Sequence, residues 1–89
     1  MSETVWLRSD EWVGTEVEDS FVMVSIETGK YVALNKTADA VWRALETPCS
    51  ASKICDILIE RFEVEPEQCA RAVATTLETM RAMELARPQ

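Results

Sequence analysis

The sequence predicts an α+β fold in which a three-stranded antiparallel sheet is followed by a three-helix bundle. Short apolar runs rich in β-branched and aromatic residues recur between residues 12 and 34, each bounded by polar or glycine turns. From Asn35 onward the apolar residues instead recur at spacings of three and four, which is typical of helices. Prolines at Pro48 and Pro66 divide this second part into three helical segments.

Three strands are predicted in the first third of the chain. Trp12–Val17 alternates between apolar and polar residues, and Phe21–Ile26 is apolar at nearly every position, so we expect it to be covered on most of both faces. Tyr31–Leu34 is expected to pair back on Phe21–Ile26 across a short loop, where Gly29 suits a positive φ. The earlier run Val5–Leu7 fits either a strand or a packing arm.

The third strand is predicted to enter the first helix with almost no loop. Asn35 stands at the change of period and is a good N-cap, because its side chain can accept from the free N–H groups of the first turn. The helix then presents one apolar face at positions i, i+3, i+4 and i+7, formed by Ala38, Val41, Trp42 and Leu45. This face is expected to anchor the core.

The second and third helices are predicted from their apolar faces. Ser50 or Ser52 caps the second helix, whose inward residues are Ile54, Ile57, Leu58 and Phe62. Pro66 begins the third helix, whose buried seam is Cys69, Val73, Leu77 and Met80. Beside this seam lies a flank without charge, made of Cys69, Ala72, Thr76, Thr79 and Met83. The flank is either a wider buried face or the wall of a groove.

Length and charge limit the classes of function. Eighty-nine residues suit a single domain over 1–89, and no apolar run approaches the roughly 20 residues that cross a bilayer. We therefore expect a cytoplasmic protein with no membrane partner. The net charge is −7, and residues 1–30 hold seven of the 16 acidic residues but two of the nine basic ones. Nucleic-acid binding depends on cationic side chains, so this balance argues against it.

The sequence offers little to catalysis or to metal binding. It contains three cysteines, Cys49, Cys55 and Cys69, without C-x-x-C pairing, and it has no histidine. We expect reduced thiols and neither a metal site nor a cofactor. Cys49 is the best candidate nucleophile, but no histidine is present to act as its base. The prediction is therefore a protein that is not an enzyme and has no catalytic residues.

Binding is the remaining class of function. A three-stranded sheet has an open edge, and a short strand held by a helix at its end offers free N–H and C=O groups. An extended peptide can add there as a further strand. The alternative is that the edge is simply covered or blunted in the native protein.

One stretch resembles a known family. Residues 29–42, GKYVALNKTADAVW, are similar to the G-x-Y-x-x-L-N-x-T-A-x-x-[IV]-W pattern of the PqqD-like family, also called the RiPP recognition element. RiPPs are ribosomally made peptides that are modified after translation. The similarity continues through Arg61–Val64 and Pro66 to the seam of the third helix, and it covers about residues 12–85.

The resemblance implies a winged-helix-like fold that binds the leader segment of a precursor peptide. It implies that the leader adds to the third strand, faces the third helix, and is delivered to a separate modifying enzyme or leader protease. Carried over by position, the leader-binding residues are Lys30, Tyr31, Val32, Ala33 and Leu34 on the strand, with Cys69, Ala72, Val73, Thr76 and Met80 on the helix.

The sequence departs from the family pattern in two places, within the third helix and at its end. At the end, the usual L-x-x-x-G-L becomes Met80-Arg81-Ala82-Met83-Glu84-Leu85. Ala72 stands where an acidic residue is frequent, and Thr76 stands where a bulky one is frequent. This favours a leader anchored by apolar or aromatic side chains, which is compatible with the free-standing family members that serve lasso-peptide pathways. The alternatives are a winged-helix DNA-binding regulator, against which the acidic residues of the third helix argue, and an oligomerisation or scaffold module. Pairing of two copies into a homodimer through the open edge also stays open.

Overall fold

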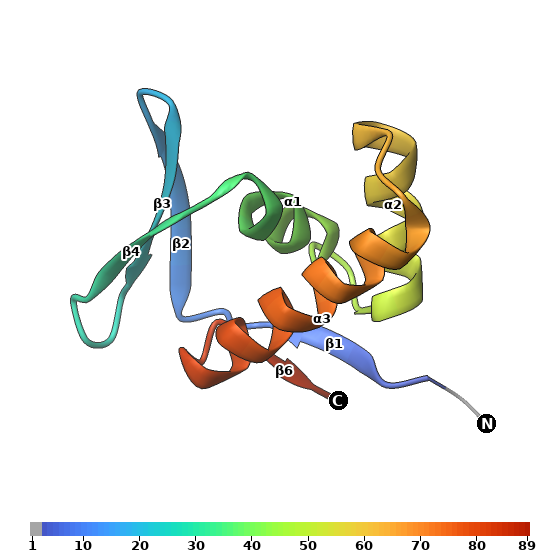
Figure 1. The fold of residues 1–89 in the computed structure, drawn as a ribbon. Helices are drawn as coiled ribbons and strands as arrows, with labels where there is room; N and C mark the ends of the chain where they lie inside the picture. Colours follow the sequence, from blue (N-terminus) through green and yellow to red (C-terminus); the bar gives the residue numbers. More distant parts are fainter. Residues whose placement is uncertain (1–2) are drawn as a thin grey trace.

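A computed structural model describes residues 3–89 and contains two small sheets and three helices (Figure 1). The elements in chain order are β1 (Val5–Arg8), β2 (Trp12–Val17), β3 (Ser20–Ser25), β4 (Tyr31–Leu34), α1 (Lys36–Ala44), β5 (Cys49–Ser50), α2 (Ala51–Phe62), α3 (Pro66–Ala82) and β6 (Ala86–Pro88). The predicted α+β class with three helices is confirmed.

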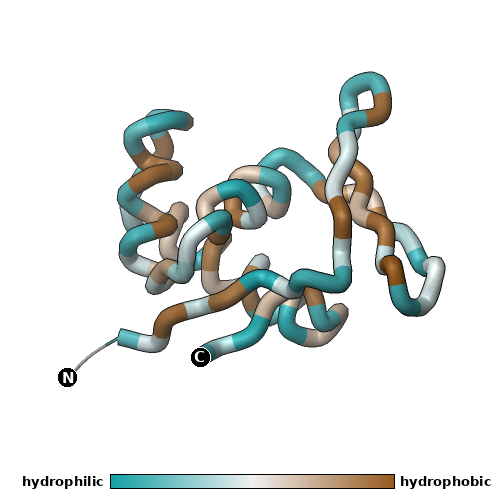
Figure 2. The backbone as a smooth tube through the Cα atoms, turned by 180° about the vertical axis from the view of Figure 1, so that it is seen from behind, coloured by the Kyte–Doolittle hydropathy of each residue, from teal (hydrophilic) through white to brown (hydrophobic). Residues whose placement is uncertain are grey.

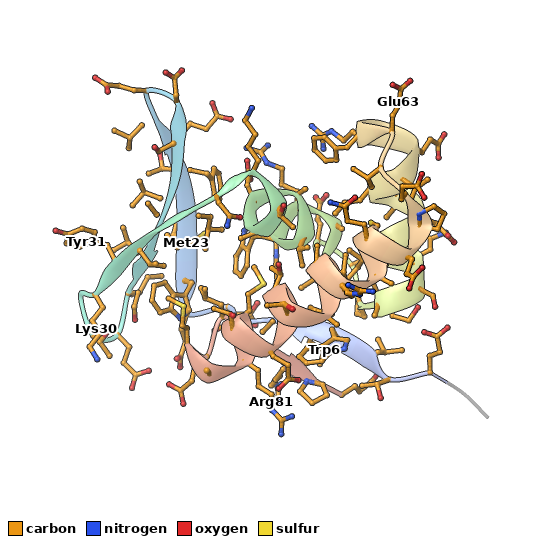
Figure 3. The ribbon with its side chains drawn as sticks, in the orientation of Figure 1. Trp6, Met23, Lys30, Tyr31, Glu63 and Arg81 are labelled. Atoms are coloured by element: carbon orange, nitrogen blue, oxygen red, sulfur yellow. The ribbon has the colours of Figure 1, made fainter. Side chains whose placement is uncertain are left out.

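Strands β2, β3 and β4 form an antiparallel meander, which we call the hairpin sheet. One of its faces packs on the helices and buries Met23 completely, whereas the other face is open (Figure 3). The expectation that β3 is covered on both faces is wrong, because Val24 is 39% exposed and Ile26, just after the strand, is 69% exposed. The helices lie on one side of this sheet only (Figure 1).

Two glycines shape the hairpin sheet. Gly29 has the predicted positive φ of 74° in the loop before β4. Gly14 has a packing role, because a Cβ atom built there would lie 2.3 Å from the ring of Phe21. Glycine has only a hydrogen atom in place of a side chain, so it leaves room for this ring beside β2. The geometry therefore requires glycine at both Gly14 and Gly29.

The second sheet was not predicted. Strand β1 lies at its centre and pairs antiparallel with β5 on one side and β6 on the other, so Val5–Leu7 belongs to a strand and not to a packing arm. The amide of Gln89 donates to the carbonyl of Val5 at 2.7 Å, which holds the C-terminal segment in place. Strands of two and three residues leave no detectable alternation in a sequence.

The predicted helix boundaries are confirmed at their N-termini. The Asn35 side chain accepts from the Ala38 amide at 2.8 Å, Ser50 caps α2, and Pro66 occupies the first turn of α3. The predicted seams are largely buried, but Phe62 is 44% exposed and does not point inward. The chain leaves α2 at Glu63 in the left-handed conformation, with a φ of 51°, and Phe62 stands beside this turn.

Arginines tie the two sheets to α1. Arg8 on β1 donates to the carbonyl of Trp42 at 3.1 Å, and its guanidinium lies 4.8 Å from the centre of that indole ring. Arg43 bonds Glu16 of β2 at 2.9 Å and lies 4.8 Å from the ring centre of Phe21. These contacts set how the hairpin sheet and β1 are oriented against α1.

Asn35→Ala tests how firmly β4 is joined to α1. We expect the free energy of unfolding to fall by about 1 kcal/mol, because one amide of the first turn loses its acceptor. Urea denaturation monitored by circular dichroism measures the change. Ser50→Ala, which removes the corresponding cap of α2, is the matched control and should cost a similar amount. A change below ~0.3 kcal/mol in Asn35→Ala would show that the cap contributes little.

Candidate functional site

Strand β4 is one of the two outer strands of the hairpin sheet, and its backbone groups alternate in direction. The Ser25 amide donates to the Lys30 carbonyl at 2.7 Å, so these residues form a hydrogen-bonded pair of the β3–β4 ladder. In an antiparallel ladder such pairs alternate with non-bonded ones. The register Met23↔Val32 and Val24↔Tyr31 therefore turns the N–H and C=O groups of Val32 toward β3.

The groups of Tyr31 and Ala33 consequently point away from the sheet, toward its open edge. The β2–β3 ladder agrees, since the Ile26 amide donates to the Glu11 carbonyl at 2.8 Å and residues of even number on β3 face β2. The backbone groups of the odd-numbered residues on β3, including Met23 and Ser25, face β4 and form hydrogen bonds with it. The open edge thus offers the N–H donors and C=O acceptors of two residues, Tyr31 and Ala33.

A cavity of about 370 Å³ lies beside the start of β4, and we call it the hairpin cleft. On one side it is lined by the hairpin, including Thr28, Lys30, Tyr31 and Val32. On the other side lie Ala82, Met83 and Glu84 at the C-terminal end of α3. The cleft therefore separates the first residues of β4 from the last turn of α3.

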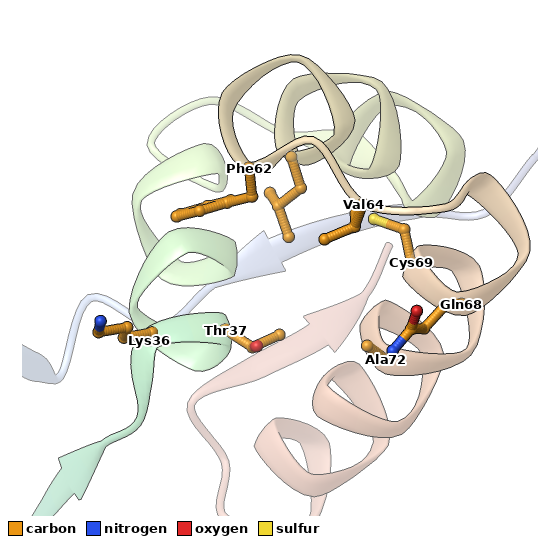
Figure 4. A pocket seen from close by; sticks show the side chains of 8 residues that line it. Lys36, Thr37, Phe62, Val64, Gln68, Cys69 and Ala72 are labelled. Atoms are coloured by element: carbon orange, nitrogen blue, oxygen red, sulfur yellow. The ribbon is translucent and has the colours of Figure 1, made fainter.

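A second cavity of about 250 Å³ lies just beyond the other end of β4, and we call it the helix pocket (Figure 4). It is open to the surface between the three helices, and most of its lining is apolar. The residues are Lys36 and Thr37 from α1, Leu58 and Phe62 from α2, Val64 from the α2–α3 turn, and Gln68, Cys69 and Ala72 from α3. The two cavities thus lie at opposite ends of β4 and of α3.

The predicted site residues divide into three groups. Lys30, Tyr31 and Val32 line the hairpin cleft, while Ala33 and Leu34 continue β4 toward the helix pocket. Cys69 and Ala72 line the helix pocket, and Thr76 is half-buried between the two cavities along α3. Val73 and Met80 are 0% and 1% exposed and lie in the core beneath this wall. They have no surface to offer a ligand in this structure.

Several lining residues were missed by the sequence reasoning. Phe62 was expected in the core, yet it forms part of the helix pocket together with Val64. Lys36 and Thr37 follow the cap residue and carry no signal of their own. Met83 belonged to the uncharged flank of the third helix, and the structure places it in the hairpin cleft. That flank was the one signal that could have pointed to it.

The three thiols are free and mostly enclosed. Burial, and after it the neighbouring Cys69 thiol, together raise the pKa of the Cys55 thiol to about 11. Cys49 is buried, and its thiol donates to the Ala44 carbonyl at 3.5 Å. Within residues 3–89, no three His, Cys, Asp or Glu side chains gather closely enough to hold a metal ion. No helix in this range is long and apolar enough to span a membrane.

Residues 20–86 match the family model described as coenzyme PQQ synthesis protein D (PqqD). The chain belongs to the PqqD family. The match spans β3 to β6 and so includes the open edge and all three helices of this PqqD-family chain. A search of curated protein sequences gave no match.

Solved structures share the fold of this PqqD-family chain. TbiB1 in complex with the TbiA(beta) leader peptide has a TM-score of 0.78 at 23% identity, with 91% of this chain and 94% of that one covered. Lasso peptide synthetase B1 complexed with its leader peptide has a TM-score of 0.76 at 24% identity, with 93% and 98% covered.

A PqqD structure shows the same arrangement. The solution structure of the PqqD truncation of Methylobacterium extorquens PqqCD, a stand-alone RiPP recognition element, has a TM-score of 0.77 at 16% identity. The coverage is 93% of this chain and 88% of that chain. At these identities the similarity shows a shared fold.

Proposed function

We propose that this protein is a non-catalytic adaptor that binds the leader segment of a ribosomally made precursor peptide by β-strand addition. The observation that carries the proposal is the open edge of β4, where the backbone groups of Tyr31 and Ala33 point outward. An added strand would satisfy these groups and extend the hairpin sheet to four strands. Family membership and the two leader-peptide complexes among the similar structures support it.

The spacing of the two cavities fits an extended peptide. From Val32 to Lys36 the chain rises about 13 Å in strand geometry. From Ala82 back to Ala72, α3 spans about 15 Å. A peptide segment of four or five extended residues beside β4 would therefore reach from the hairpin cleft to the helix pocket, with α3 as its opposite wall.

The lining of the helix pocket favours an apolar or aromatic leader side chain. Leu58, Phe62 and Val64 supply apolar surface, and Ala72 leaves the space in front of it free. Burying such a side chain in a pocket of this kind gains about 2 kcal/mol. We propose a lasso-peptide pathway as the setting, because one of the similar structures is lasso peptide synthetase B1 complexed with the leader peptide.

The proposed partners are the precursor peptide and a separate modifying enzyme or leader protease. The adaptor itself contributes binding and no chemistry, and we place it in the cytoplasm, acting as one domain over residues 1–89. The winged-helix-like description of its architecture remains a prediction.

Calorimetric titration with the leader segment of a candidate precursor peptide tests the proposal. We expect one-to-one binding with a Kd in the micromolar range or tighter, equivalent to about −8 kcal/mol. A scrambled leader of the same composition is the control and should not bind. Binding to duplex DNA at low salt, with none to the leader, would favour the DNA-binding alternative instead.

A further inference from the structure

The outer face of the hairpin sheet, which is turned away from the helices, gathers most of the exposed apolar surface. Among residues 3–89, six large apolar side chains are well exposed, and five of them lie on or beside this sheet. They are Val13, Val17, Val24, Ile26 and Tyr31, with exposed fractions from 39% to 77%. Tyr31 extends away from the body of the protein (Figure 3). The brown segments of the same strands stand clear of the helices in Figure 2.

The strand register shows that this surface is continuous. Val13, Val24 and Tyr31 are direct neighbours across the three strands and form one row. Thr15, Val22 and Ala33 form the next row, and neither row contains a charged side chain. We call these two rows, with Val17 and Ile26 at their ends, the outer face. On an ordinary protein surface, exposed apolar residues are scattered singly. Here they are grouped on one side of a sheet.

Acidic residues stand at both ends of the outer face. Glu18 and Asp19 form the turn between β2 and β3. Glu11 and Glu27 lie at the opposite end, where Lys30 is a basic neighbour. A hydrogen bond with the Glu27 side chain, together with its negative charge, raises the pKa of the Glu11 carboxyl. The shift reflects how closely the two carboxyl groups lie at that end.

Charge and area both disfavour a second copy as the occupant. Because both ends are acidic, either antiparallel or parallel stacking of two outer faces brings carboxylates against carboxylates. Two strands of six residues and one of four cover at most roughly 14 Å by 20 Å, or about 300 Å². A stable interface buries about 800 Å² on each partner, so the outer face alone suits a weaker, transient contact.

We propose that the outer face docks the enzyme that receives the leader, through an apolar patch on the enzyme flanked by lysine or arginine at both ends. This inference rests on the proposed function, because a leader bound at β4 lies along the border of the same sheet. The leader would join adaptor and enzyme and raise the effective concentration of a weak contact. The apolar rows then supply burial, while the acidic ends steer and orient the enzyme.

Two variants and one control test the docking. Val24→Glu places a charge in the middle of the outer face, and the double variant Val13→Thr with Val24→Thr keeps strand propensity while making the face more polar. Ser52→Glu adds the same charge at an exposed position on α2, away from the hairpin sheet. Biolayer interferometry measures binding of the purified leader protease or modifying enzyme of the same precursor to each adaptor–leader complex. Fluorescence anisotropy measures the affinity of the adaptor for the leader alone.

We expect Val24→Glu to weaken enzyme binding about tenfold or more, and the double threonine variant to weaken it about threefold, with leader affinity unchanged. Ser52→Glu should bind like the wild type, and added salt should slow association of the enzyme. Unchanged enzyme binding in both face variants would overturn the inference while leaving the proposed function intact. A dimer in sedimentation experiments that Val24→Glu dissociates would also overturn it. Absence of leader binding in the wild type would instead reject the proposed function, and the inference with it.

Discussion

Ala33→Pro is expected to weaken leader binding about 10- to 100-fold while the hairpin sheet stays folded. The amide of Ala33 points to the open edge, so proline removes a donor that the added strand needs and puts ring carbons in its place. The β3–β4 ladder loses nothing, because Ala33 donates no bond to it. Proline at such an outward position of an edge strand is tolerated. Calorimetry with the leader measures the loss, and circular dichroism checks the fold.

Val32→Pro is the companion variant to Ala33→Pro. Its amide faces β3, so proline there breaks the inner ladder. We expect loss of both stability and leader binding, whereas Ala33→Pro should lose binding alone. Equal stability losses in the two variants would show that the backbone directions assigned to β4 are incorrect. Wild-type leader affinity in Ala33→Pro would mean that the leader does not add to this edge.

Ala72→Phe is expected to reduce leader affinity about tenfold or more by filling the helix pocket. Ala72 lies on the wall formed by α3, and a benzyl group there would occupy space that we assign to an apolar leader side chain. The loss of that side chain's burial is worth about 2 kcal/mol, which corresponds to a roughly 30-fold change in Kd. Leader titration by calorimetry measures it.

Ala74→Phe is the matched control for Ala72→Phe. Ala74 is exposed on the same helix, about 200° away around its axis, and it lines neither cavity. The same substitution there should leave leader affinity within about twofold of wild type. If the two variants bound the leader equally well, the helix pocket would have no part in recognition.

Local periodicity was enough to predict the hairpin sheet and the three helices. Asn35, Ser50 and Pro66 have strong chemical reasons to begin helices, and the structure places each at a helix start. The second sheet could not be predicted in this way. Its pairing joins residue 5 to residue 50 and residue 8 to residue 86, and strands so short are recognisable only from their partners.

The candidate site was harder to predict than the fold. A helical wheel cannot separate a seam from the wall beside it, so Val73 and Met80 were grouped with Ala72 and Thr76 although they are fully buried. The direction of each amide on β4 depends on which pairs of the ladder are hydrogen-bonded. The sequence alone does not indicate which pairs of the ladder are hydrogen-bonded. The outward direction of the Tyr31 and Ala33 groups follows from the Ser25–Lys30 and Ile26–Glu11 hydrogen bonds.

Amide hydrogen exchange of β4, measured by NMR with and without the leader, tests strand addition most directly. In the free protein we expect protected amides at Val32 and Leu34 and fast exchange at Tyr31 and Ala33, because the latter two face the open edge. Saturating leader should protect Tyr31 and Ala33 as well, which would give protection at every residue of the strand. Unchanged fast exchange at both residues in the saturated complex would contradict β-strand addition at this edge.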